Sequence, residues 1–171
     1  PNPSPGSTPR PNGRTADPPA LAGLPFDRWD AVLSQAMDWG LLAPHEVQGF
    51  LRIQPTLPYF LRTRLHDQPD LRASVETAFR QHYDRLGKEL HTLITSQKAP
   101  ERQLGLALMA VEFENLSTAT ELALRDRVSF FNAFEALFRF LNTQSAHAQA
   151  VYLCQRVWAA RSAYTPAEMS E

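Results

Sequence analysis

Few residue pairs in this 171-residue chain have the types and spacing that catalysis or metal binding needs. His82 and His91 are nine positions apart, so they lie on different faces of a helix and cannot hold one ion. His147 and Cys154 are seven positions apart and share a helix face, as a thiol and its general base would. Two helical turns separate them by ~10 Å, however, which is too far for a hydrogen bond. Neither pair predicts a catalytic or metal site.

Cys154 is the only cysteine, so the chain has no internal disulfide and too few thiolates for a metal site. It lies in an apolar helical series with Ala150, Leu153 and Val157, which predicts a buried structural thiol. This cysteine usage indicates a reducing, cytoplasmic setting.

The glutamates Glu112, Glu114 and Glu121 have the spacing of paired carboxylates on a helix, but no His or Lys partner follows them. A solvated or salt-bridged helix face is the expected role. The only Gly-Lys pair, Gly87-Lys88, is followed by Glu within a helical pattern, so no phosphate-binding loop is predicted. We therefore expect no enzyme activity, no cofactor and no metal.

The elements that would position any site are almost all helical. Apolar residues recur at helical spacing in six segments, at residues 28–39, 57–65, 70–96, 100–124, 129–142 and 145–164. Asp27 is the expected N-cap of the first helix and Gly40 its C-terminal stop. One β-ribbon is expected at residues 47–53, before Pro55. The short hinge at residues 142–144 predicts antiparallel packing of the last two helices. The fold class is an all-α antiparallel bundle.

The domain boundaries follow from composition. Residues 1–25 contain eight of the 14 prolines and are expected to form a disordered linker. Residues 26–66 hold the ribbon and two short helices, residues 67–164 form the helical domain, and residues 165–171 are a polar tail. The net charge of −1 gives no global attraction to nucleic acid or to anionic membranes. No apolar run approaches the roughly 20 residues of a membrane helix.

The helix at residues 129–142 is apolar nearly all around its circumference, which is typical of a central core helix or of a helix covered on its outer side by a partner. If it is uncovered, it favours self-association. The expected partner-binding residues are Phe130, Phe131, Phe134, Phe138 and Trp158.

The last helix pair resembles a degenerate tetratricopeptide (TPR) repeat. Counting from Phe134, Leu137 is three residues on, Leu141 seven and Ala150 sixteen, which is the TPR spacing. Phe138 replaces the usual glycine of that pattern. The resemblance implies two closely packed helices that could begin a repeat stack.

Two further segments resemble bacterial STAND ATPases, the NLR-like signalling family. Gln54-Pro55 with Tyr59-Phe60-Leu61 is similar to the end of their winged-helix domain. The stretch from Glu112 to Leu124 is similar to a motif between winged helix and TPR array, with matches at Glu114, Asn115, Leu116, Ala119 and Ala123.

The STAND resemblance implies a winged-helix-like remnant at residues 26–66 and a regulatory helical arm, as in prokaryotic defence systems. The partner would be an effector, protease or ATPase subunit. Because the chain lacks a P-loop, the resemblance to STAND ATPases does not imply that this chain hydrolyses ATP. Asn115, in the middle of a helix, indicates a kink, a buried hydrogen bond between helices, or a merely exposed side chain.

An alternative function to partner binding is nucleic-acid binding by the winged-helix-like segment. In that case Arg52, Arg62 and Arg64 would contact phosphates.

Overall fold

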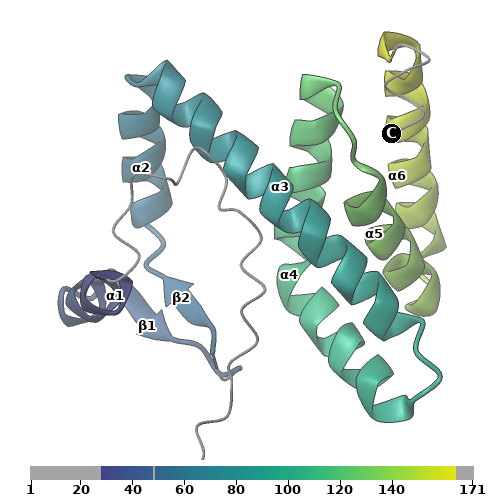
Figure 1. Cartoon of the computed structure of the whole chain (residues 1–171), viewed down its shortest axis with the longest axis horizontal. Coiled ribbons are helices and arrows are strands. Elements are labelled where there is room, and N and C mark those ends of the chain that lie inside the picture. The colour runs from purple at the N-terminus through teal and green to yellow at the C-terminus, as the bar shows by residue number, and fades with distance from the viewer. Residues whose placement is uncertain (1–27, 48, 165–171) are drawn as a thin grey trace, which may run out of the picture.

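A computed structural model describes residues 28–47 and 49–164. The expected linker at 1–25, the Asp27 cap and the tail at 165–171 lie outside the described residues. The order of elements is α1 (Trp29–Asp38), β1 (Leu42–Pro44), β2 (Leu51–Ile53), α2 (Leu57–His66), α3 (Pro69–Ile94), α4 (Ala99–Asp126), α5 (Phe131–Thr143), α6 (His147–Ala160) and the 3₁₀ turn η3 (Arg161–Ala163). The predicted all-α class is confirmed, since the sheet in this part of the chain is one small hairpin (Figure 1).

The hairpin shows where the sequence pattern was incomplete. β2 falls inside the ribbon predicted at residues 47–53, but its antiparallel partner β1 lies just after the first helix, where no strand was expected. The register pairs Leu42 with Ile53 and Pro44 with Leu51. Gly40 has a φ of +67°, so it ends α1 in the left-handed conformation expected of it.

The hydrophobic core belongs to three helices, α3, α4 and α5, each of which packs against the other two. In Figure 1 α3 passes in front of α4, and α5 lies between these two long helices and α6. The buried apolar cluster draws on all three helices and consists of Leu90, Ile94, Met109, Leu116, Ala133, Ala136 and Leu137. The apolar α5 is therefore a central helix, as one of the two interpretations of its sequence predicts.

Two glycines allow the helices of this core to approach closely. A Cβ atom on Gly87 of α3 would lie 2.8 Å from the Cα atom of Ala133 in α5. A Cβ atom on Gly105 of α4 would lie 2.7 Å from the Cβ atom of Leu93 in α3. Since such distances are far inside van der Waals contact, both crossings need a residue without a side chain.

Polar contacts fix the same helices at three points along their length. The Tyr83 hydroxyl donates to Glu112 Oε2 at 3.1 Å, and Asn115 Nδ2 donates to the same oxygen at 2.8 Å. Asn115 thus bonds within α4, whereas the link between the two helices runs from Tyr83 to Glu112, so the interhelical hydrogen bond considered for Asn115 is not confirmed. Glu76 on α3 pairs with Arg125 on α4 at 2.6 Å. The third point is the bond from Asn132 Nδ2 at the start of α5 to Asp84 Oδ2, at 2.9 Å.

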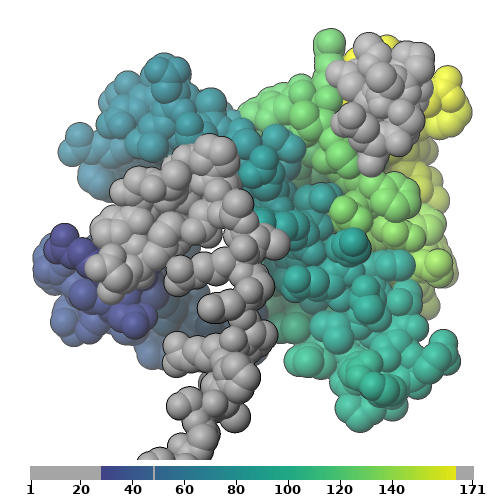
Figure 2. All heavy atoms as spheres, viewed as in Figure 1, coloured from purple at the N-terminus to yellow at the C-terminus, as the bar shows by residue number. Residues whose placement is uncertain are grey.

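Both ends of the described chain are less well packed than this core. No residue from 28 to 47 or from 49 to 77 is buried, and the first buried side chain is Ala78. At the other end, the one buried residue of α6 is Ala150. In the space-filling view the purple and blue N-terminal atoms and the yellow atoms of α6 lie at opposite ends (Figure 2). Among the helices described, none is long and apolar enough to cross a bilayer.

Candidate functional site

Aromatic rings form a continuous row along one side of α5. Phe130, Phe134 and Phe138 are four residues apart, and successive ring centroids are 6.0 Å apart. Tyr164, after η3, extends the row, because its ring packs against Phe130 at 5.9 Å. The Tyr164 hydroxyl also donates toward the carbonyl oxygens of Ala123, at 3.1 Å, and Val128, at 3.2 Å. The row therefore ties the end of the described chain to the end of α4.

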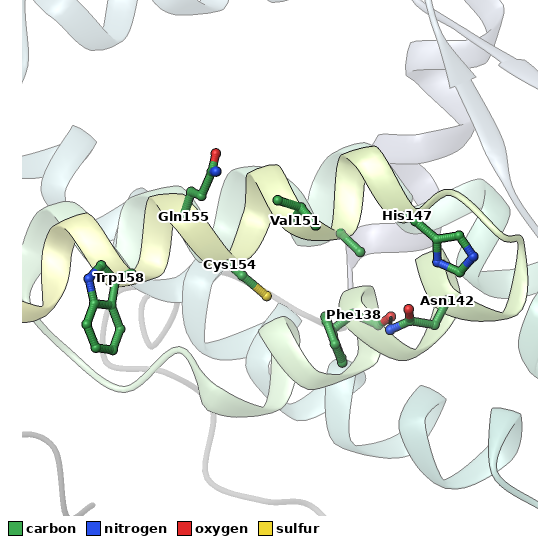
Figure 3. Close-up of a pocket in the computed structure, with 8 residues that line it drawn as sticks. Phe138, Asn142, His147, Val151, Cys154, Gln155 and Trp158 are labelled. Carbon is green, nitrogen blue, oxygen red and sulfur yellow. Dashed lines mark hydrogen bonds between the residues drawn. The ribbon is translucent and has the colours of Figure 1, made fainter.

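Phe138, the last ring of this row, lines a groove between α5 and α6, which we call the α5–α6 groove. It has a volume of about 690 Å³. Phe138 and Asn142 line it from α5. The α6 side chains lie on one helix face, because positions 147, 150, 151, 154, 155 and 158 recur every three or four residues (Figure 3). Those residues are His147, Ala150, Val151, Cys154, Gln155 and Trp158.

Large apolar side chains are left open to solvent along this groove. Trp158 is 68% exposed and Val151 is 55% exposed. The guanidinium of Arg161 lies 4.2 Å from the centroid of the Trp158 ring, which places a positive charge at that end of the groove. None of the groove-lining residues is acidic. The groove is thus apolar with basic character.

Cys154 corrects one prediction. Its thiol is half-buried and lines the α5–α6 groove, whereas the sequence pattern indicated a buried structural residue. The prediction was wrong because it took the apolar stripe at positions 150, 153 and 157 to be covered by other helices. In the structure α6 packs mainly on α5, so part of its surface stays open. Cys154 and His147 line the same groove two helical turns apart, as the sequence spacing predicts.

The structure brings only part of the predicted partner-binding set together. Phe138 and Trp158 line the α5–α6 groove, and Phe134 stacks on Phe138 behind it. Phe130 is half-buried between Phe134 and Tyr164. Phe131 is 60% exposed and does not line the groove. Three residues that line the groove were not expected from the sequence to bind a partner: Asn142, Val151 and Gln155. The four-residue spacing of positions 147, 151 and 155 could have indicated that they share one face of α6.

The arginines of the nucleic-acid alternative do not form one surface. Arg52 on β2 lies 3.8 Å from Glu46 in an exposed ion pair. Arg62 and Arg64 are two residues apart on α2, so they point to nearly opposite sides of the helix. The Arg64 guanidinium lies 5.4 Å from the centroid of the Phe60 ring.

The glutamates considered for acid–base chemistry have separate surroundings. Glu112 accepts the hydrogen bonds from Tyr83 and Asn115, and burial together with the charge of Glu112 raises the pKa of Tyr83 well above its usual value. Glu121 pairs with Arg156 at 3.4 Å, and Glu114 is exposed. His91 lies 3.5 Å from Glu135 of α5 and His82 packs edge-on against Tyr83, so the two histidines face different neighbours.

Among residues 28–47 and 49–164, no three His, Cys, Asp or Glu side chains are grouped so that they could hold a metal ion. No protein-family model matches the chain, and neither a curated protein nor a solved structure resembles it at a significant level. A functional proposal therefore has to start from the surfaces of this chain.

Proposed function

We propose that the chain is a non-catalytic protein–protein interaction module that acts as a regulatory scaffold, and that the α5–α6 groove receives a helix of its partner. One observation carries the proposal: α6 holds its apolar side chains along an open groove, with Ala150 as its one buried residue. Tryptophan is among the residues that contribute most to binding at protein interfaces, so the exposed Trp158 at this groove is suited to anchor a partner.

The dimensions of the groove suit one helix. α6 has 14 residues, so the wall it provides is about 21 Å long. A partner helix of three to four turns with an apolar stripe would cover Val151, Cys154 and Trp158 together. Removing these apolar side chains from water favours the complex, and the loss of translational, rotational and side-chain freedom on binding opposes it.

The charges around the groove select the partner's polar residues. Arg161 lies over Trp158 at one end, and no residue that lines this groove is Asp or Glu. A second copy of this face would therefore offer no acidic partner for Arg161, whereas a different helix can. An amphipathic helix with acidic residues beside its apolar stripe is the complementary partner.

The signalling context of this module stays a proposal that rests on the resemblances. Leu137, Leu141 and Ala150 are buried at the TPR-like positions, which supports a repeat-like pair α5–α6. We propose that the module belongs to a cytoplasmic STAND or TPR-type system, such as prokaryotic defence, and that its partner is an effector, protease or ATPase subunit.

The test compares four versions of the tagged full-length chain as bait in an extract of its host. The versions are wild type, Val151→Glu, Trp158→Ser and the control Phe131→Ser, which removes an equally exposed aromatic outside the groove. A specific partner is retained by wild type and by the control, and its affinity falls about tenfold or more with each groove variant. A partner retained equally by all four versions does not use this groove and overturns the proposal.

The single cysteine gives an independent readout with the purified partner. Since Cys154 lines the groove, bound partner should slow its alkylation by N-ethylmaleimide, while the rate with Phe131→Ser should match wild type. An alkylation rate unchanged by saturating partner would contradict docking at this site.

Nucleic-acid binding is the second candidate, because α2 combines basic residues with an exposed ring. The helix carries Arg62, Arg64 and His66 without Asp or Glu, and Tyr59 is 73% exposed. A single-stranded oligonucleotide would stack on Tyr59 and contact Arg62, three residues along the helix. Fluorescence anisotropy at two salt concentrations tests this, and binding that Arg62→Gln does not weaken would exclude α2 as the site.

A further inference from the structure

A second groove lies between α4 and α6, on the other side of α6 from the first, and α5 forms its floor. We call it the α4–α6 groove; its volume is about 210 Å³. The floor is made by two buried leucines, and the walls come from α4 and α6. These apolar lining residues are Leu137 and Leu141 of α5, Phe113 and Leu124 of α4, and Tyr152 and Leu153 of α6.

The two α4 hydroxyl groups that line the α4–α6 groove, those of Ser117 and Thr120, have no proton left for a ligand, and the third lining hydroxyl, that of Tyr152, lies at the rim beside Arg156. Ser117 Oγ donates to the carbonyl oxygen of Phe113 at 2.8 Å. Thr120 Oγ1 donates to the carbonyl oxygen of Leu116 at 2.9 Å. Polar groups in the buried part of a ligand would therefore lose their hydrogen bonds to water without replacement, whereas an alkyl chain has no such bonds to lose. The volume corresponds to about seven water molecules, which fits an apolar body of about seven or eight carbon atoms.

Charged groups occur only at the rim of this groove. Arg156 Nη2 lies 3.4 Å from Glu121 Oε1, across the gap between α6 and α4. Arg156 is also held by Tyr152, because Nη1 donates to the Tyr152 hydroxyl at 3.2 Å and the guanidinium lies 5.9 Å from the ring centroid. The side chain of Glu121 is 62% exposed.

This asymmetry decides which charge a ligand can carry. A ligand anion can take the place of Glu121 on Arg156, since Arg156 keeps its two contacts with Tyr152 and the exposed Glu121 turns into water at little cost. A ligand cation on Glu121 would lie beside the positive charge of Arg156, which its contacts with Tyr152 hold at the rim. The rim therefore favours an anionic head group.

We propose that the α4–α6 groove binds a small anionic amphiphile of the medium-chain fatty carboxylate class. The alkyl chain lies on Leu137 and Leu141 between the two helices, and the carboxylate pairs with Arg156 at the rim. This site is separate from the α5–α6 groove and does not depend on a protein partner there.

The probes are three molecules with the same eight-carbon chain and different heads: octanoate, octanol and octylamine. Isothermal titration of the full-length chain should give octanoate a Kd of about 0.1–1 mM, as ligands of about ten heavy atoms reach. Octanol should bind about fivefold more weakly because it lacks the ion pair, and octylamine more weakly still.

Two pairs of matched variants locate the site. Gln149→Trp and Gln155→Trp both change an exposed glutamine of α6, but Gln149 lines the α4–α6 groove and Gln155 lines the α5–α6 groove. Octanoate binding should be lost in Gln149→Trp and kept in Gln155→Trp. Arg156→Gln should lower octanoate affinity about fivefold and leave octanol unchanged, whereas Arg139→Gln, at an exposed position of α5, should change neither.

Three results would overturn the proposal: no saturable octanoate binding below about 10 mM, equal affinity for octylamine and octanoate, or equal binding to Gln149→Trp and wild type. The alkylation rate of Cys154 should stay the same in saturating octanoate, since that thiol lines the other groove. A lowered alkylation rate would place octanoate in the α5–α6 groove and also overturn it. None of these results bears on whether a partner helix binds the α5–α6 groove.

Discussion

Gly87 and Ala133 bring the backbones of α3 and α5 into contact, since a Cβ atom on Gly87 would lie 2.8 Å from Ala133 Cα and 2.8 Å from the carbonyl oxygen of Asn132. The obstructing atoms belong to the backbone, so no rotamer change relieves the clash. On either side of this contact, Asp84 binds Asn132 and His91 faces Glu135. The position of α5, and of α6 packed on it, follows from this crossing.

Gly87→Ala should therefore destabilise the protein, although alanine is the better helix former by about 1 kcal/mol. We expect a loss of about 1–3 kcal/mol in the free energy of unfolding, measured by urea denaturation. Lys88→Ala, at the next and exposed position, should change it by less than about 0.5 kcal/mol. If Gly87→Ala is more stable than wild type, α5 does not cross α3 at this residue.

The Tyr164 hydroxyl should contribute measurably to stability through its two carbonyl acceptors on Ala123 and Val128. Tyr164→Phe keeps the ring packing on Phe130 and removes only the hydrogen bonds, so the expected loss is about 1 kcal/mol in thermal or urea unfolding. Tyr59→Phe is the matched control at a highly exposed ring and should have no effect. Equal effects of the two changes would mean that the Tyr164 contacts do not form.

Alkaline pH should weaken the contact between α3 and α4 at Tyr83. Burial, and then the charge and hydrogen bond of Glu112, raise the pKa of this phenol above its ordinary value of 10.0. The unfolded chain releases the Tyr83 proton first, so the contribution of Tyr83 to stability is constant below about pH 10 and falls as the pH rises further. Denaturation series across this range should show a shallower fall for Tyr83→Phe than for wild type. An identical slope would show that Tyr83 titrates alike in both states.

Acidic pH should act through Glu76. Partial burial raises the pKa of this carboxyl, but hydrogen bonds from Arg125 and Arg72 outweigh burial, and the net pKa is below the ordinary 4.5. The resulting stability is present above that pH and is lost as the pH falls through the lowered pKa. Glu76→Gln should reduce the pH dependence of stability below about pH 5, by at most about 1 kcal/mol for so exposed a pair. The exposed Glu114→Gln is the control, and an equal response of both variants would contradict the ion pair.

The sequence by itself determined the helices but not the strand β1, because helix formation follows from local periodicity and end signals whereas a strand depends on its partner. The apolar spacing placed α3 to α6 within a few residues of their observed bounds, and Gly40 ended α1 as its lack of a side chain suggests. Of the five residues expected to bind a partner, Phe138 and Trp158 line the α5–α6 groove and Phe130, Phe131 and Phe134 do not, and partner binding by any of them stays a prediction.

Only the tertiary structure decided which helix faces are covered by other helices and which are exposed to solvent. A stripe such as Ala150, Leu153 and Val157 has the same pattern whether its helix is covered or open, so the exposure of Cys154 could not follow from spacing. The pairing of β1 with β2 and the contact of Gly87 with Ala133 join residues distant along the chain. The two grooves beside α6 exist because α6 packs mainly on α5, leaving both of its other sides open, and this depends on the crossing of α3 by α5.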